Sequence, residues 1–161
     1  MAGKVDLKNL NLVHGHQGPV IDLKWNPYND NILASAGDDG HIRIWFISDE
    51  VDTSDLQPIR ILKHHIKRVC MLQWHPSAQN ILAACSFDGK VSFWNVDKGE
   101  LIHDIDSHEA EVFGISWNYN GSQIATVCKD NKLRIFDAHT GEKLQECHVV
   151  IAVTPVLAYP T

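Results

Sequence analysis

A chain of 161 residues is long enough to bury the core of one ordinary domain. Its 14 basic and 20 acidic residues give a formal net charge of -6, which argues against an intrinsic nucleic-acid binder and, more weakly, against a membrane-surface protein. The four cysteines form no CxxC pair, and Cys70, Cys85 and Cys128 lie in apolar runs. We therefore expect reduced, buried thiols and not a disulfide framework.

Short alternating runs rich in β-branched and aromatic residues predict strands along most of the chain. In chain order they are expected near residues 19–25, 31–36, 41–46 and 57–63, then 68–74, 80–85, 90–95 and 100–105, and finally 111–117, 122–127, 132–136 and 143–147. Turn residues separate them: Asn29-Asp30 predicts a polar turn, Asp38-Asp39-Gly40 and Asp88-Gly89 predict tight turns, and Asn120-Gly121 predicts a hairpin.

The same residue types recur in each group of four strands. Each group has a histidine, a tryptophan nine residues later, and an aspartate six residues before a closing aromatic. The three sets are His16, Trp25, Asp39 and Trp45; His65, Trp74, Asp88 and Trp94; and His108, Trp117, Asp130 and Phe136. Self-similarity at a period of about 20–50 residues is typical of repeat proteins. With Gly15-His16 at the start, the pattern predicts blades of a WD40-type β-propeller.

The fold class predicted from these repeats is all-β, with about three four-stranded blades in a single partial propeller over residues 1–161. The blades are expected at about 14–63, 64–105 and 107–147. A strand of a preceding blade is expected at 7–13, and residues 148–161 form a divergent tail. Three blades leave open sheet edges and two apolar faces, so we expect the chain alone to be aggregation-prone, to close by self-association or to pair with the missing blades.

The recurring polar residues resemble catalytic triads, first as Ser35, His16 and Asp39. A catalytic set occurs once, beside an oxyanion site, whereas these sets recur from unit to unit. We therefore predict structural hydrogen bonds that run from the turn aspartate through the histidine and a hydroxyl to the indole N–H. The expected members are His16, Ser35, Asp39, Trp45, His65, Asp88, Trp94, His108, Thr126 and Asp130. Because Ala84 stands at the hydroxyl position of the second unit, that chain is expected to be one link shorter.

Signals for enzymes and metal sites are missing from the sequence. It holds no Walker A, GxGxxG, HExxH or GxSxG string, so we expect no enzyme and no cofactor. His14 and His64 have no third ligand at useful spacing, which argues against a metal site. The polar residues 1–10 do not resemble a signal peptide, and the apolar stretch 149–159 is too short to span a bilayer.

Three strings are more particular than the general repeat. They are Trp25-Asn-Pro-Tyr-Asn-Asp-Asn31, Trp74-His-Pro-Ser-Ala-Gln-Asn80, and Cys128-Lys-Asp-Asn-Lys-Leu-Arg134. Together they resemble the coronin family of actin-binding WD-repeat proteins, over about residues 13–143. The resemblance implies a seven-bladed propeller, of which this chain holds about three blades. It also implies a non-enzymatic cytoplasmic protein of the cytoskeleton that binds filamentous actin and other cytoskeletal regulators.

Two basic groups are candidates for partner binding: Lys67 with Arg68, and Lys129 with Lys132 and Arg134. The alternative interpretation is a solvated strand start for the first group and the polar face of an outer strand for the second. Two other functions also stay open at this point. One is a generic WD40 adaptor in vesicle traffic or a ubiquitin-ligase complex, and the other is a truncated product without independent function.

Overall fold

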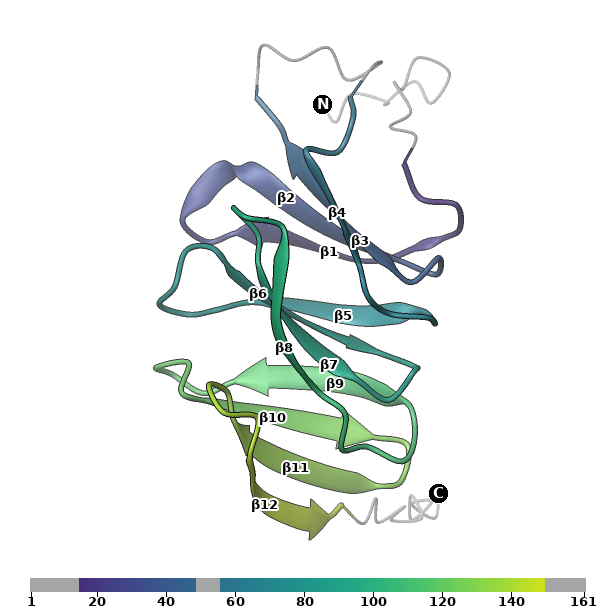
Figure 1. Cartoon of the computed structure of the whole chain (residues 1–161), viewed down its shortest axis with the longest axis vertical. Coiled ribbons are helices and arrows are strands. Elements are labelled where there is room, and N and C mark those ends of the chain that lie inside the picture. The colour runs from purple at the N-terminus through teal and green to yellow at the C-terminus, as the bar shows by residue number, and fades with distance from the viewer. Residues whose placement is uncertain (1–14, 49–55, 150–161) are drawn as a thin grey trace, which may run out of the picture.

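The computed structural model describes residues 15–48 and 56–149, and every regular element in them is a β-strand (Figure 1). The predicted strand at 7–13 lies outside the described residues, as does the predicted tail apart from its first two residues. Within the described part of the chain there is no helix that could cross a membrane.

Twelve strands form three four-stranded antiparallel sheets, which confirms the predicted fold class. The first sheet contains β1 (Val20–Asn26), β2 (Asn29–Gly37), β3 (His41–Phe46) and β4 (Arg60–Lys63). The second contains β5 (Val69–Trp74), β6 (Ile81–Ser86), β7 (Val91–Asn95) and β8 (Glu100–Ile105). The third contains β9 (Val112–Trp117), β10 (Gln123–Cys128), β11 (Lys132–Asp137) and β12 (Lys143–His148).

One predicted turn is misplaced. β2 already begins at Asn29, so the turn lies at Pro27-Tyr28 and not at Asn29-Asp30. The side chain of Asn26 explains the shift, because its Oδ1 accepts the backbone N–H groups of Tyr28 and Asn29 and closes the chain two residues earlier.

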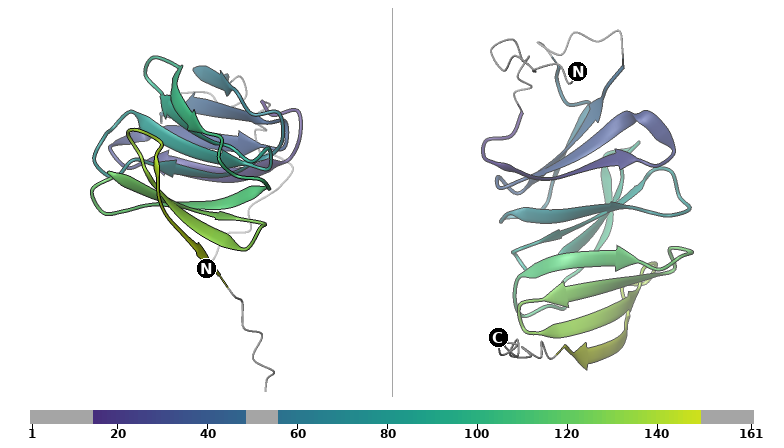
Figure 2. Two further views of the ribbon diagram at one scale, coloured as in Figure 1. Left: turned by 60° about the horizontal axis from the view of Figure 1, so that its bottom comes forward. Right: turned by 180° about the vertical axis from the view of Figure 1, so that it is seen from behind.

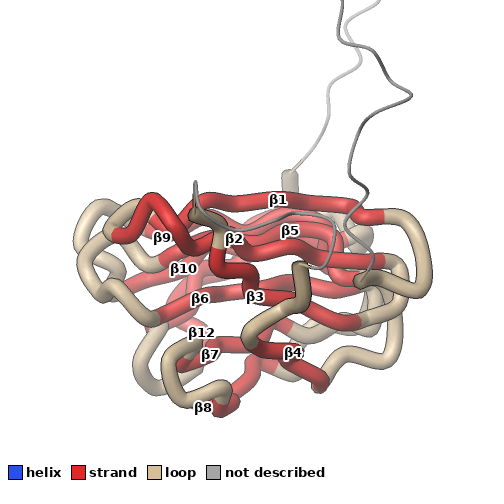
Figure 3. Tube along the Cα trace, turned by 90° about the horizontal axis from the view of Figure 1, so that it is seen from above, coloured by secondary structure: helices blue, strands red, loops and turns tan. Residues whose placement is uncertain are grey.

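The three sheets stack face to face (Figures 1 and 2). Within each sheet the strands follow chain order, so β1, β5 and β9 are the first strands of their sheets, and β5 contacts both β1 and β9. Seen along the stack, these first strands lie on one side and β4 and β8 lie on the other (Figure 3). This is the arrangement of consecutive propeller blades around an axis near the first strands.

Two apolar clusters fill the spaces between the sheets. The first joins Ala34, Ala36, Ile42, Ile44 and Leu62 of the first sheet to Val69, Leu72, Trp74, Leu82, Ala84 and Trp94 of the second. The second joins Ala83, Cys85, Val91, Phe93 and Ile105 to Val112, Ile115, Ile124 and Phe136 of the third. The second sheet is therefore buried on both faces, and burial of these faces is the main stabilising term of the stack.

Tryptophans at the ends of first strands attach each sheet to the one before it. The indole Nε1 of Trp74 donates to the carbonyl of Lys24 at 3.1 Å, and Nε1 of Trp117 donates to the carbonyl of Gln73 at 3.3 Å. Both bonds span about one repeat, and both carbonyls belong to first strands. The repeated tryptophans thus act between blades, as backward clamps.

The residue after each tryptophan attaches a sheet to the one that follows. Asn26 Nδ2 donates to the carbonyl of Gln79 at 2.9 Å, and His75 Nε2 lies 3.1 Å from the carbonyl of Gly121. His75 Nδ1 accepts two backbone N–H groups of its own loop, so the proton is assigned to Nε2, which donates to Gly121. These forward clamps explain the asparagine and histidine in the Trp-Asn-Pro and Trp-His-Pro strings.

Substitution of Gly121 tests the forward clamp. Gly121 has φ of 76°, and an added Cβ would lie 2.1 Å from the His75 ring. We expect Gly121→Ala to lower the free energy of unfolding by about 1–2 kcal/mol for the left-handed backbone, and by about 1 kcal/mol more for the displaced hydrogen bond. Chemical denaturation measures both terms together.

Gly141→Ala is the matched control. Gly141 has φ of 73°, but the nearest atom to its added Cβ is 3.8 Å away, so only the backbone cost applies. Equal destabilisation by the two alanines would show that the His75 contact contributes nothing.

Candidate functional site

The first sheet contains a complete chain of polar side chains. Asp39 at the β2–β3 turn accepts from His16 Nδ1 at 3.0 Å, and His16 Nε2 lies 2.7 Å from the hydroxyl of Ser35 on β2. The indole Nε1 of Trp45 on β3 donates to the same hydroxyl at 2.9 Å. Arg43, across from Ser35 in the ladder, donates from Nη1 to Asp39 at 2.9 Å, and the same nitrogen lies 2.6 Å from His16 Nδ1.

This geometry does not suit nucleophilic catalysis, although the distances resemble a triad. Ser35 is only 2% exposed, and its oxygen already contacts both His16 and Trp45. A substrate carbonyl therefore has no path to it, and a triad requires an accessible nucleophile beside oxyanion donors. The chain instead satisfies polar groups that are costly to bury alone.

The second sheet has a chain of equal length, so the expected missing link is wrong. His65 Nδ1 contacts Asp88 at 3.0 Å, and His65 Nε2 lies 2.7 Å from the hydroxyl of Ser92. Trp94 Nε1 donates to the same hydroxyl at 2.9 Å. Ser92 on β7 is the ladder partner of Ala84 on β6, so the hydroxyl has moved to the neighbouring strand without leaving the site.

The third sheet differs most from the predicted chain. His108 Nε2 lies 2.8 Å from Thr126 Oγ1, but Phe136 offers no N–H to continue it. Asp130 contacts Arg134 instead of His108, and His108 Nδ1 is buried without a hydrogen-bond partner among the described residues. The expected Asp130–His108 bond is therefore wrong, because the guanidinium of Arg134 takes the carboxylate.

Burial and charge move the pKa values along these chains. Burial lowers the pKa of His108 to about 4, and the nearby Arg134 charge adds to the shift. Burial alone would raise the pKa of Asp88, but the His65 side chain and backbone N–H groups hold it at about 2. Asp39 is held well below its ordinary range in the same way, against burial, by the N–H of Gln17 and by His16.

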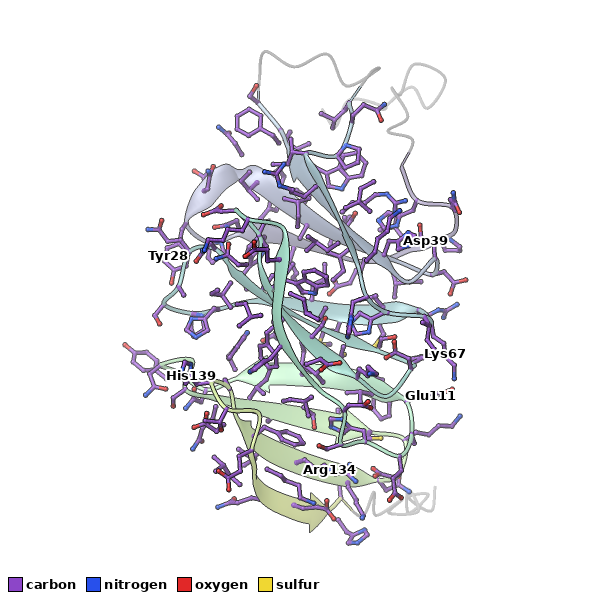
Figure 4. All side chains as sticks on the ribbon, viewed as in Figure 1. Tyr28, Asp39, Lys67, Glu111, Arg134 and His139 are labelled. Carbon is purple, nitrogen blue, oxygen red and sulfur yellow. The ribbon has the colours of Figure 1, made fainter. Side chains whose placement is uncertain are left out.

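The loops that enter the first strands and the tight β2–β3-type turns lie on one side of the stack. Asp39, Lys67 and Glu111 mark this side in Figure 4, and Tyr28 and His139 mark the opposite side. We call the first side the turn face; its candidate residues are Ile66, Lys67, Arg68, Phe87, Glu111 and Lys129. A depression of about 310 Å³ opens there between the second and third sheets, and Lys67, Phe87, Glu111 and Lys129 line it.

Lys67 and Arg68 lie together on the turn face, as neighbours at the start of β5. Lys67 is exposed, and its amine forms no ion pair with any described residue. Arg68 Nε donates to Asp38 of the first sheet, and its guanidinium lies 5.7 Å from the centre of the Phe87 ring. Sequence reasoning missed the neighbouring Ile66, which is 86% exposed and is an unusual apolar side chain for such a loop.

The second basic group does not form one surface. Lys129 is exposed and pairs with Glu111 at 2.9 Å, at the rim of the depression. Lys132 and Arg134 share a face of β11, and both contact Glu146 of β12 at 2.9 Å. Arg134 is only 3% exposed, so its assignment to a binding surface is wrong: it is an internal partner of Asp130.

The histidines do not gather into a metal site in the described part of the chain. No group of three or more His, Cys, Asp or Glu side chains there could hold an ion. His64 Nε2 contacts Asp104 at 2.9 Å, and the His64 ring packs edge-on against the Trp94 ring, so His64 has a packing role. His14 lies outside the described residues.

The sequence matches the family model of the WD domain, G-beta repeat, at residues 7–45, 56–95 and 99–137. The last two matches begin before the outer strand of one sheet and end with the third strand of the next. Each of these two sequence repeats therefore spans two sheets. The chain of each one crosses one boundary between neighbouring sheets.

Among curated proteins the chain is similar to Coronin-2B of Xenopus laevis, at 54% identity over 135 residues, and to Coronin-2B of Homo sapiens, at 53% over 137. These alignments cover 83% and 84% of this chain but 28% of either relative. Among solved structures it is similar to the WD40 domain of Toxoplasma gondii coronin, with a TM-score of 0.77 and 32% identity over 83% of this chain and 34% of that one. The predicted family resemblance is confirmed, and the chain spans about a quarter to a third of these relatives.

Moving a hydroxyl between strands tests the polar chain of the second sheet. Ser92→Ala leaves both His65 and Trp94 without their shared partner, and we expect it to lower the free energy of unfolding by about 1–3 kcal/mol. Adding Ala84→Ser restores a hydroxyl at the position that Ser35 occupies in the first sheet. The double variant should recover much of the loss in denaturant titrations; purely additive losses would contradict the interpretation.

His108 makes stability depend on pH in a defined direction. Its folded pKa of about 4 lies below its ordinary value of 6.5, so between these values the unfolded chain binds a proton that the folded chain does not. The free energy of unfolding therefore falls as pH drops through this window. We expect His108→Gln to reduce that slope by up to about 1.4 kcal/mol per pH unit.

The slope is measured by denaturant titration at several pH values. His139→Gln, at an exposed histidine, is the control and should leave it unchanged. Wild-type pH dependence in His108→Gln would assign the proton uptake to other groups.

Proposed function

The chain belongs to the WD40-repeat family, as a coronin-like member, and on this basis we propose that it binds filamentous actin through the turn face. It thereby helps to regulate the actin cytoskeleton as a non-enzymatic interaction module. WD40 and coronin proteins are in general modules of this kind. Cytoplasmic and cytoskeletal location is part of the same proposal.

The observation that carries the proposal is the combination of exposed charge and exposed apolar surface at residues 66–68. Ile66 and Lys67 both point away from the packed sheets, while the adjacent His65 is buried in the second polar chain. An apolar side chain among charged neighbours is the composition of a protein-binding surface, since the apolar part supplies affinity and the charges supply orientation.

Arg68 fits the same role despite its ion pair with Asp38. Only its Nε is engaged, and the guanidinium carries five N–H donors, so its terminal nitrogens remain to bind a carboxylate. The Phe87 ring beneath it limits its rotation. An exposed pair of this kind contributes little to stability, so its charge can be altered without unfolding the chain.

Co-sedimentation with actin filaments tests the proposal. We expect the wild-type chain to pellet with filaments, and the pelleted fraction to fall as ionic strength rises, because exposed charges are screened. Lys67→Glu/Arg68→Glu should reduce pelleting by at least tenfold in affinity, which corresponds to about 1.4 kcal/mol.

Arg60→Glu/Lys98→Glu changes the net charge equally and serves as the control. Arg60 and Asp97, the neighbour of Lys98, line one hollow with Tyr28, which lies opposite the turn face. Loss of pelleting in the control as well would indicate a general charge effect. Undiminished pelleting of Lys67→Glu/Arg68→Glu would remove these residues from the proposal. A wild-type chain that never pellets would overturn actin binding itself and favour a generic WD40 adaptor.

A further inference from the structure

Two cysteine side chains meet inside the second sheet, at an internal position of the stack. Cys70 lies on β5 and Cys85 on the neighbouring β6, and their Sγ atoms are 3.3 Å apart. Both are free thiols. The ladder gives partners on β6 to Val69 and Met71 but not to Cys70, which is the extra residue of a β-bulge. The bulge therefore brings two sulfurs into contact across adjacent strands.

The other two sheets have the same bulge but no sulfur at these two positions. Ile21 of β1 and Phe113 of β9 are the extra residues there. Ala36 and Val127 stand at the position of Cys85. Apolar side chains thus serve at both positions elsewhere in the stack, so the blade does not need a thiol at either one to form. The thiol pair distinguishes the second sheet from its neighbours.

Cys70 also joins the second sheet to the third. Its Sγ lies 2.9 Å from the carbonyl oxygen of Val112 on β9 and 3.3 Å from that of Cys85. A thiol has one hydrogen, which we assign to the shorter contact, so that the S–H of Cys70 donates to Val112. Cys85 and Val112 are both fully buried in the apolar cluster between the two sheets. A chemical change at these sulfurs therefore acts on a boundary between blades.

The two sulfurs differ in their access to a small oxidant. Cys70 is half-buried, whereas Cys85 is fully buried. The hydrogen bond with Cys70 and burial together raise the pKa of Cys85 well above its ordinary value, so Cys85 remains a neutral thiol at rest. Cys70 is therefore the sulfur that meets an oxidant first, and Cys85 is placed to act as the resolving thiol.

We propose that Cys70 and Cys85 form a redox pair that hydrogen peroxide closes into a disulfide between β5 and β6. Attack of the Cys70 sulfur on a peroxide oxygen breaks the O–O bond, and the thiol proton goes to the departing hydroxide, which leaves a sulfenic acid and one water. The Cys85 sulfur then attacks the oxidised sulfur, the S–O bond breaks, and the departing hydroxide takes the Cys85 proton to form the second water. The two thiols together lose two electrons and two protons, which convert one peroxide into two waters.

Closure of the disulfide changes two contacts at the boundary between the second and third sheets. The disulfide has no S–H, so Cys70 no longer donates to Val112. The two sulfurs also move from 3.3 Å to about 2.05 Å apart, which draws Cys70 toward β6. We therefore expect oxidation to loosen β9 while it cross-links the second sheet. The inference does not depend on actin binding.

Thiol counting and mass spectrometry of the peroxide-treated chain test the pair. Cys147→Ser is the background for all variants, because Cys147 is exposed and would otherwise link two copies. Of the four cysteines three then remain, and peroxide should reduce the free thiols from three to one. The peptide that contains residues 70 and 85 should become about 2 Da lighter, whereas oxidation of Met71 adds an oxygen. A reducing agent should restore all three thiols.

Two variants separate the sulfur chemistry from the fold. Cys85→Ala introduces the residue that the first sheet has at this position, so it should fold, and its oxidation should stop at a Cys70 sulfenic acid that dimedone traps. Cys70→Ser keeps a hydroxyl donor for Val112 but has no sulfur to oxidise, so its thiols should survive the same treatment. Three free thiols after treatment of the background chain, or loss of thiols in Cys70→Ser, would overturn the pair.

Hydrogen exchange of the β9 amides tests the effect on the boundary. Because one hydrogen bond between the sheets is lost, the exchange rate in β9 should rise about fivefold when the background chain is oxidised. It should stay unchanged in Cys70→Ser under the same treatment. Unchanged β9 exchange in a chain whose disulfide has formed would overturn the link between oxidation and the sheet boundary.

Discussion

Each four-stranded sheet in this protein has two apolar faces, and a face is buried only where another sheet lies on it. The second sheet meets that condition on both sides, which is why its strands are the most completely buried. The third sheet ends in β12, whose six residues are all exposed. Stability therefore comes from boundaries between sheets more than from any single sheet, as in other repeat architectures. The offset between sequence repeat and sheet reinforces this, because the second and third repeats each contribute strands to both sides of one boundary.

A stack of apolar faces must still accommodate the polar groups of its repeat signature. In each sheet a buried hydroxyl contacts the histidine, but its strand and its ladder partner differ. The hydroxyl belongs to Ser35 on β2, paired with Arg43, in the first sheet and to Ser92 on β7, paired with Ala84, in the second. In the third sheet it belongs to Thr126 on β10, paired with Arg134. In the first sheet the turn aspartate contacts both the histidine and Arg43, whereas in the third sheet Arg134 contacts Asp130 and His108 does not. The depressed pKa of His108 follows from this competition, since burial and the Arg134 charge both act on a ring that lacks the aspartate.

Period and turn chemistry were sufficient to predict all twelve strands and their grouping, because both signals are local. The errors arose where the outcome depended on contacts between strands. The repeat alignment does not reveal Ser92, because the hydroxyl stands on the strand paired with the expected position, although a serine between Val91 and Phe93 is itself a signal in a buried strand. The sequence also does not place Arg134, because the alternation within one strand shows which residues share a face but not whether that face is covered. The hydrogen bonds of the tryptophan indoles could not be predicted from the sequence, because their acceptors are backbone carbonyls about fifty residues away.

Under the proposed function, the residues that fix the fold and the residues that contact the partner are different ones. His65 is fixed by Asp88 and Ser92, and the chain then leaves the core within one residue, so Ile66 and Lys67 project from an anchored point. Little conformational entropy remains in the backbone of that loop to be lost on binding, which favours affinity for a given contact area. Under the proposed function, the polar chain that resembles a catalytic triad acts through rigidity: it fixes the backbone of the turn face, and contact with the partner is assigned to the exposed residues beside it.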